Sequence, residues 1–230
     1  MSLGQWIRHW GEQNIYFVLV DDYSRKTFAY FMKRKSEVFE NFKYFKAQAE
    51  KQVGFKIKTL RSDNGGEFVN NNMKNFLKEH GIIHQTTVPK TPGQNGVAER
   101  NFRSVVEKAR TLLSHAKLPK TFWAEAVNTA VHIKNRVPTK ALKGKVPNEM
   151  FYGKRIDLGY LRVFGCDAYV HIAGEKRGKF DPKAKRYIFV GYCEGTDYWI
   201  QKIQKELSRQ GTLSFLKLSS RGTGNVVKLR

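Results

Sequence analysis

Cysteine and long apolar runs are both scarce in this sequence of 230 residues, and each scarcity excludes a class of protein. There are two cysteines, Cys166 and Cys193, and neither belongs to a CxxC pair. We therefore expect neither a scaffold held by disulfides nor a zinc site built from cysteines. The apolar run at residues 16–20, YFVLV, is too short to cross a bilayer, and no stretch resembles a signal peptide. The expected location is intracellular and reducing.

Acidic residues are also few. The chain has 20 aspartates and glutamates against 42 lysines and arginines, which gives a net charge of +22. The surplus is spread along the chain, so the folded body itself must be positive. A charge of this size favours a polyanionic partner, nucleic acid before a membrane surface. The alternative is a basic protein whose charge only keeps it soluble.

Hydrophobic residues make up 40% of the chain, enough to bury a core, and their pattern alternates between strands and helices. Runs rich in β-forming residues predict strands at residues 15–20, 27–33, 55–62 and 82–88, the first two as a hairpin. Helical spacing predicts helices at residues 36–53, 70–80, 97–115 and 118–137. This order is typical of an α/β fold.

Composition further divides the chain into five parts. We expect residues 15–138 to form the α/β domain, residues 139–159 a linker, and residues 160–199 a small unit of short strands. Residues 1–14 show no clean period, and residues 200–230 show no convincing core pattern.

Two acids stand at places where an α/β fold builds ligand sites. Asp63 follows a predicted strand, and open α/β sheets bind ligands at the carboxyl ends of their strands. Glu99 lies in the first turn of a predicted helix. If folding brings both carboxylates to one point, they repel each other unless a cation such as Mg²⁺ or Mn²⁺ lies between them, which would suit phosphodiester chemistry. The alternative is that Asp63 starts an Asx turn and Glu99 only favours a helix N-terminus.

Four ordered motifs, which cover about residues 15–199, make the chain similar to a known family. They are YFVLVDDYSRKTFAYF, LRSDNGGEF, HGIIHQTTVPKTPGQNGVAER and LRVFGCDAYVHI…KAKRYIFVGY. They resemble the integrase of Ty1/copia-type retrotransposon Pol polyproteins. The resemblance implies a ribonuclease-H-like core with an SH3-like unit after it. It also implies a D…D-x35-E triad that binds two divalent metal ions. Asp63 and Glu99, with 35 residues between them, match the second and third acids of that triad.

The resemblance further implies partners and a location. Integrases of this family trim the ends of the element's DNA, join them to target DNA and generally work as multimers. The expected partners are therefore DNA and other copies of the chain, and the expected location is the nucleus.

The first acid of the triad has no match. Its expected place, on the first strand of the core, falls in residues 1–14, where Glu12 is the sole acid. Asp21 and Asp22 match a turn of the family that is not catalytic. That first strand is central in the fold, so either residues 4–10 replace it or the domain is barely stable. Two main hypotheses follow, an active polynucleotidyl transferase and an inactive relic that only binds DNA; a distant nuclease of the same fold is a third. The missing first acid favours the relic, so we expect this chain alone to be inactive.

Basic and amide side chains near Glu99 are the candidate DNA-binding residues. Arg103 and Arg110 lie 4 and 11 positions after Glu99 and so share its helix face, whereas Arg100 is adjacent. The full expected set lies on this helix and in the loop before it: Lys90, Gln94, Asn95, Arg100, Arg103 and Arg110. The alternative is an ordinary solvated helix face. Asn64 is expected to orient Asp63 by a hydrogen bond.

Overall fold

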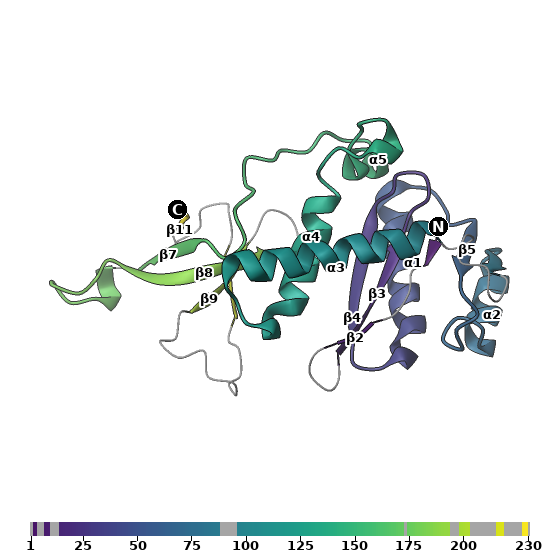
Figure 1. Ribbon diagram of the computed structural model, residues 1–230, viewed down its shortest axis with the longest axis horizontal. Coiled ribbons are helices and arrows are strands. Elements are labelled where there is room, and N and C mark those ends of the chain that lie inside the picture. Colours follow the sequence, from purple (N-terminus) through teal and green to yellow (C-terminus); the bar gives the residue numbers. More distant parts are fainter. Residues whose placement is uncertain are drawn as a thin grey trace. The chain divides into compact units, whose positions relative to one another are not determined.

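The computed structural model describes residues 2–3, 7–9, 14–87, 96–172, 174–193, 198–202, 215–218 and 227–229. Contacts along the chain divide it into two units. The first comprises Met1–Glu107 and Ile133–Ile156, and the second comprises Lys108–His132 and Asp157–Arg230. Each unit is described by itself below (Figure 1).

A mixed sheet forms the centre of the first unit. Strands β3 (Asn14–Val20) and β4 (Thr27–Met32) form the predicted antiparallel hairpin, with Tyr16 opposite Phe31. Strands β5 (Thr59–Ser62) and β6 (Ile83–Thr86) pair in parallel. With the short strands β1 (Ser2–Leu3) and β2 (Ile7–His9), the strand order is β2-β3-β1-β5-β6, and β4 pairs with β3.

The central position of this sheet is filled. Strand β1 (Ser2–Leu3) lies between β3 and β5, with Ser2 opposite Val20 on one side and Arg61 on the other. Strand β2 (Ile7–His9) pairs with the beginning of β3. Residues 1–14 therefore include strands that extend the sheet, although their composition shows no period. The centre is held by Ser2 and Leu3, which lie just before the stretch expected to replace the first strand.

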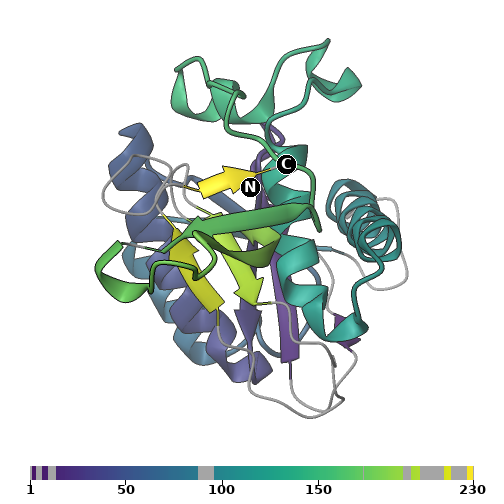
Figure 2. The ribbon, with the colours of Figure 1, turned by 90° about the vertical axis from the view of Figure 1, so that its left-hand side faces the viewer.

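The two faces of β3 bury different side chains, because successive residues of a strand point to opposite faces. Phe17 joins the core under helix α1 (Val38–Val53), where Phe42 and Phe45 are buried at the predicted helical spacing. Tyr16 points the other way and stacks on Phe102, with ring centroids 5.2 Å apart. Figure 2 shows α1 and helix α3 (Gly96–Ala116) on opposite sides of the sheet.

Three further helices follow, α2, α3 and α4. Helix α2 (Asn71–Glu79) begins at Asn70, whose side chain accepts a hydrogen bond from the Met73 backbone, and it packs on the same core as α1. Helix α3 spans Gly96–Ala116, one residue longer at each end than predicted, and it buries the predicted stripe of Ala98, Phe102, Val105 and Ala109. Helix α4 spans Trp123–Lys134. The short 3-10 helices η1 (Lys35–Glu37) and η3 (Lys120–Phe122) precede α1 and α4.

The segment after α4 packs within the first unit up to residue 156. It holds the short helices η4 (Lys140–Leu142) and α5 (Pro147–Tyr152), in a region that composition presented as a linker. Asn135 ties it to the hairpin, because its side chain accepts from the Thr27 N–H at 2.8 Å and donates to the Thr27 carbonyl at 2.7 Å. The side chain thereby replaces a strand partner for Thr27.

The hairpin turn between β3 and β4 carries two unusual basic residues. Arg25 has a left-handed backbone, with φ of 57°. Lys26 is buried, and its Nζ lies 3.5 Å from the ring centroid of Tyr152 and 4.6 Å from that of Phe151. Burial, with a smaller contribution from the nearby Arg136 charge, lowers the pKa of Lys26 to about 7. The aromatic faces favour the charged ammonium and so oppose part of this shift.

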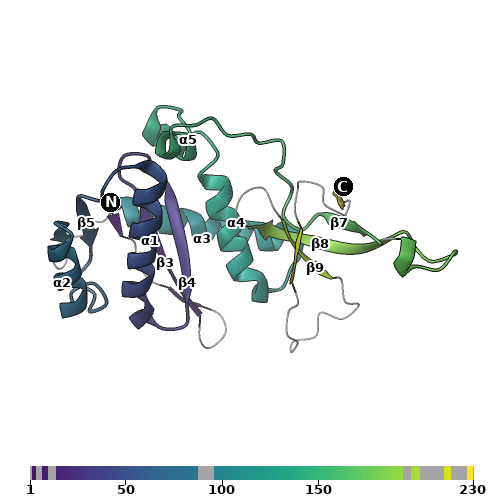
Figure 3. The same cartoon turned by 180° about the vertical axis from the view of Figure 1, so that it is seen from behind.

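An antiparallel sheet forms the second unit (Figure 3). Its described strands are β7 (Asp167–His171), β8 (Ala184–Tyr192), β9 (Tyr198–Lys202), β10 (Phe215–Leu218) and β11 (Val227–Leu229), in the order β10-β9-β8-β7-β11. The 3-10 helix η5 (Gly174–Lys176) lies between β7 and β8. Tyr192 is buried in its core and stacks on His132 of α4, with centroids 4.0 Å apart. Both edge strands come from residues 200–230, where the sequence showed no core pattern.

Candidate active site and DNA-binding residues

Asp63 lies directly after β5, at the carboxyl end of two parallel strands, as expected. Its Oδ1 accepts a hydrogen bond from the Gly65 N–H at 3.1 Å, which makes an Asx turn. The side chain is partly buried, and within the described residues its Oδ2 accepts no hydrogen bond. The turn thus uses one carboxylate oxygen and leaves the other for a ligand. Both interpretations of Asp63 are compatible with this geometry.

Glu67 is an acid near Asp63 that sequence reasoning missed. A Cβ added to Gly65 would lie 2.9 Å from the Glu67 carboxylate and 3.1 Å from Asp63 Oδ1, so both carboxylates approach one point beside this glycine. Lys35 lies 3.3 Å from Glu67 and offsets its charge. The signal in the sequence was a second acid four residues after Asp63, across a Gly-Gly turn.

A serine and a histidine hold the backbone of Asp63. Ser62 is fully buried, and its Oγ donates to the Asp63 carbonyl at 2.8 Å. His84, on β6, lies with its Nε2 2.9 Å from the same Oγ. Burial, with a smaller contribution from the Lys74 charge, lowers the pKa of His84, which keeps the ring neutral at pH 7.

Asn64 does not orient the Asp63 side chain, contrary to expectation. Its Nδ2 donates to the Thr87 carbonyl at 2.9 Å instead, so it joins the ends of the two parallel strands. Asp21 accepts from the backbone and side chain of Ser24 and caps the hairpin turn. Asp22 pairs with Arg25 at 3.4 Å and Arg61 at 3.7 Å. Both aspartates therefore have structural partners in the hairpin.

Glu99 lies in the first turn of α3 and is partly buried. Arg103 and Arg110 are exposed, and helical spacing places them on its side of the helix. Arg100 lies on a different side, where it lines a cavity with Asn101, and its Nε donates to the Gly96 carbonyl at 2.9 Å. The expected DNA-binding residues of α3 thus divide between two sides. Lys90, Gln94 and Asn95 lie outside the described residues.

Within the part of the chain that the structure describes, no three acidic, histidine or cysteine side chains form a group that could hold a metal ion. The convergence of Asp63 and Glu99 on one ion stays a prediction. Among the helices that the structure describes, none is both long and apolar enough to cross a membrane.

Comparisons with known proteins match two parts of this chain to known families. The model of the integrase core domain family matches residues 6–92, and that of the retroviral polymerase SH3-like domain matches residues 166–205. The retrovirus-related Pol polyprotein from transposon TNT 1-94 of Nicotiana tabacum is 47% identical over 206 residues. That match covers 88% of this chain but 15% of the polyprotein.

Solved integrase structures share the fold. In the simian T-cell lymphotropic virus intasome, solved in complex with PP2A regulatory subunit B56 gamma, a chain aligns with a TM-score of 0.54 at 15% identity, covering 94% of this chain and 74% of that one. The HTLV-2 integrase catalytic core domain, solved in complex with magnesium, aligns with a TM-score of 0.50 at 20% identity, covering 65% of this chain and 93% of that one. These likenesses confirm the ribonuclease-H-like fold class, and at such identities they show the fold alone.

Proposed function

Because the chain belongs to the integrase family of copia-type retrotransposon Pol polyproteins, we propose that it binds DNA and transfers polynucleotide ends with the help of a divalent metal ion. The position of Asp63 carries this proposal. It lies at the carboxyl ends of two parallel strands, and Glu99 follows it in the first turn of α3 with 35 residues between them. Its setting is a chain of net charge +22. In this proposal the chain acts in the nucleus, as a multimer.

Oxygen atoms at this site suit a hard cation. Asp63 keeps one oxygen outside its turn, and carboxylates are the ligands that Mg²⁺ and Mn²⁺ prefer. Asp63 and Glu99 would hold the ion. When bound, it would activate a nucleophile and stabilise the leaving oxygen of a phosphodiester.

The chain's own residues would place the DNA. Arg103 and Arg110 would neutralise backbone phosphates beside Glu99, so that the negatively charged DNA could approach two carboxylates. Ser62 and His84 would keep the backbone of Asp63 in place, because a ligand that shifts by about 1 Å loses much of its effect.

A strand-transfer assay tests the proposal. The full chain with Mn²⁺ is expected to join a duplex oligonucleotide carrying an element end to a target plasmid. Asp63→Asn is expected to lower joining by roughly 100-fold or more, since even residues that only support metal ligands contribute 10- to 100-fold. An asparagine keeps the Asx turn, so DNA binding should stay unchanged.

Asp157→Asn is the matched control, because Asp157 makes the same turn with the Gly159 N–H at 2.8 Å. Joining that survives in Asp63→Asn would contradict the role of Asp63. DNA binding without any joining, with Mn²⁺ or Mg²⁺, would instead support the inactive relic. The comparisons give that alternative no better support than the active integrase.

A further inference from the structure

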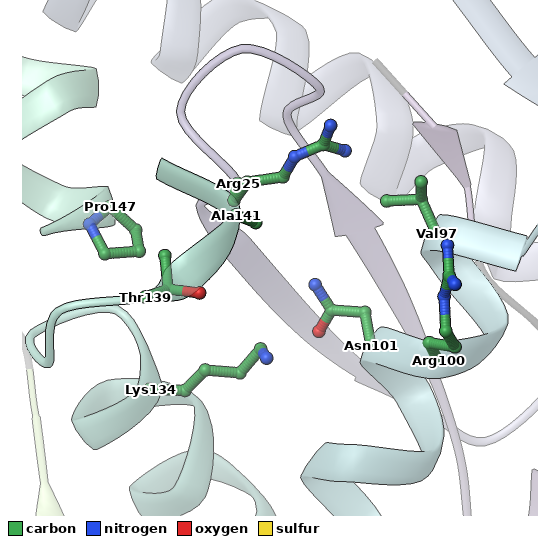
Figure 4. A pocket seen from close by; sticks show the side chains of 8 residues that line it. All are labelled: Arg25, Val97, Arg100, Asn101, Lys134, Thr139, Ala141 and Pro147. Atoms are coloured by element: carbon green, nitrogen blue, oxygen red, sulfur yellow. The ribbon is translucent and has the colours of Figure 1, made fainter. Parts of the chain in front are cut away.

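The first unit contains a cavity of about 400 Å³ beside the start of α3. Its wall combines three basic, two neutral polar and three apolar side chains: Arg25, Arg100, Lys134, Asn101, Thr139, Val97, Ala141 and Pro147 (Figure 4). They come from the hairpin turn, from α3, from the end of α4 and from the segment after α4. No acidic side chain is among these described lining residues.

The charge of the cavity is positive. Arg25 lies 3.4 Å from Asp22, but Asp22 also lies 3.7 Å from Arg61, so its single negative charge serves two arginines. Arg100 uses its Nε in a bond to a backbone carbonyl, which carries no formal charge. Arg100 therefore adds positive charge that Asp22 does not offset. With three basic side chains and no acidic one in the described lining, an anion is the favoured occupant.

Asn101 gives the cavity a specific donor. It is 8% exposed, and its Oδ1 accepts a hydrogen bond from Thr27 Oγ1 at 3.1 Å. This bond assigns the Nδ2 group to the other side, and no described residue accepts a hydrogen bond from it. Figure 4 shows the amide facing the open space on the side of Lys134 and Thr139. This amide group can therefore donate to a ligand in the cavity that accepts hydrogen bonds.

A buried polar network holds the cavity in shape. Thr27 bonds to Asn101 through its side chain and to Asn135 through its backbone. The Asn135 carbonyl in turn accepts from the Asn148 N–H at 2.9 Å. These four residues are between 1% and 8% exposed. They join the hairpin, α3 and the segment after α4 into one frame, so the cavity does not have to form around its ligand.

We propose that this cavity binds a backbone phosphodiester of DNA, at a place separate from Asp63. This inference rests on the proposed function for its choice of DNA as the source of the phosphate. Arginine, lysine and amide groups are donors that recognise phosphate oxygens. The apolar part of the wall, Val97, Ala141 and Pro147, would contact the flanking deoxyribose, which a free phosphate lacks. A volume of about 400 Å³ lies within the range of small-molecule sites.

The dinucleoside monophosphate TpT tests the site directly. We expect TpT to shift the side-chain amide NMR signal of Asn101, and a neutral methylphosphonate analogue of TpT to leave it unchanged. Asn101→Asp keeps the acceptor for Thr27 but replaces the donor with a negative charge. It is expected to weaken TpT binding roughly 10- to 100-fold, the range for a hydrogen bond to a charged group.

A second variant covers the case in which Asn101→Asp does not fold. The double change Arg100→Gln and Lys134→Gln should also weaken TpT binding roughly 10-fold or more. Lys43→Gln, at a surface lysine of α1 paired with Glu40, is the control and should bind as the wild type does. Equal TpT affinity in the control and the pocket variants would overturn the proposal.

The source of the phosphate is tested by competition. Inorganic phosphate should displace TpT much less effectively than a second TpT does, because it has no sugar. Equal displacement would overturn the assignment to DNA. Duplex DNA binding by the wild type is measured alongside: failure there with TpT binding intact removes the proposed function alone, whereas DNA binding without a TpT response at Asn101 removes this inference alone.

Discussion

The two sides of α3 near its start are built in different ways. On one side Asn101 lies over a buried polar network, and the cavity beside it has a fixed shape. On the other side Arg103 and Arg110 are exposed arginines on the helix side of Glu99, and no network of this kind holds them within the described residues. One helix can therefore offer a phosphate two kinds of contact. The contact on the cavity side depends on preformed geometry, whereas the contact on the side of Arg103 and Arg110 depends on charge density and weakens as salt increases.

Removing the frame under the cavity should have the largest effect. Asn135→Ala leaves the N–H and carbonyl of buried Thr27 without their partners, so the free energy of unfolding should fall by about 2–4 kcal/mol. Urea unfolding measures the loss. Asn75→Ala, at an exposed position of α2, is the control and should change stability by less than about 0.5 kcal/mol. Similar losses of stability in the two variants would show that the hydrogen bonds between Asn135 and Thr27 do not stabilise the fold.

At the hairpin turn two neighbouring basic residues have different surroundings: Arg25 lines the cavity, whereas Lys26 is buried against aromatic rings. The pH dependence of the free energy of unfolding tests this difference. Burial lowers the pKa of Lys26 to about 7, from an ordinary value of 10.5. Between these values the unfolded chain binds more protons than the folded one, so stability should rise as pH increases from 7 toward 10. We expect roughly 1 kcal/mol per pH unit, below the limiting slope of about 1.4, because the rings favour the ammonium.

Lys26→Met removes the titrating group while filling much of the same space. The variant should lose this rise and be more stable than the wild type at pH 7, in urea unfolding series at pH 7, 8 and 9. If the wild type shows the same slope as Lys26→Met, the lysine is charged in the fold and the rings outweigh its burial.

The smallest expected effect is a difference in salt dependence: substitutions on the two sides of α3 should change the salt dependence of DNA binding differently. Arg103→Gln should weaken duplex DNA binding a few-fold and reduce the salt slope by about 1, because one phosphate contact is lost. Lys134→Gln, on the cavity side, should keep more of its loss at high salt, since Lys134 is partly buried and a partly buried charge is screened less. Binding isotherms between 50 and 200 mM salt measure both. Identical salt dependence for the two variants would contradict the division between an open side and a cavity side.

Local patterns allowed much of the framework to be predicted. The stripe on α3, the β3–β4 hairpin and the place of Asp63 after β5 each depend on a few neighbouring residues. The cavity could not be predicted in this way, because its wall joins Arg25, the start of α3 and residues 134–147. In the sequence Asn135 is only a polar residue near the end of a predicted helix. Its hydrogen bonds to Thr27 join residues 108 positions apart, which no local pattern predicts.

Short strands were harder to recognise than the long one. Strand β1 has two residues and β11 has three, too few to show a period of two, and their place depends on the strands beside them. The approach of Glu67 to Asp63 likewise depends on the backbone conformation at Gly65. Two successive glycines allow that conformation but do not specify it.

The backbone of Arg25 sets folding and recognition against each other. An arginine with φ of 57° holds a conformation that disfavours L-residues by roughly 1–2 kcal/mol, whereas glycine adopts it freely. Arg25→Gly would therefore relax the hairpin and at the same time remove a guanidinium from the cavity. Arg25→Gly should therefore be more stable than the wild type and yet bind phosphate less tightly.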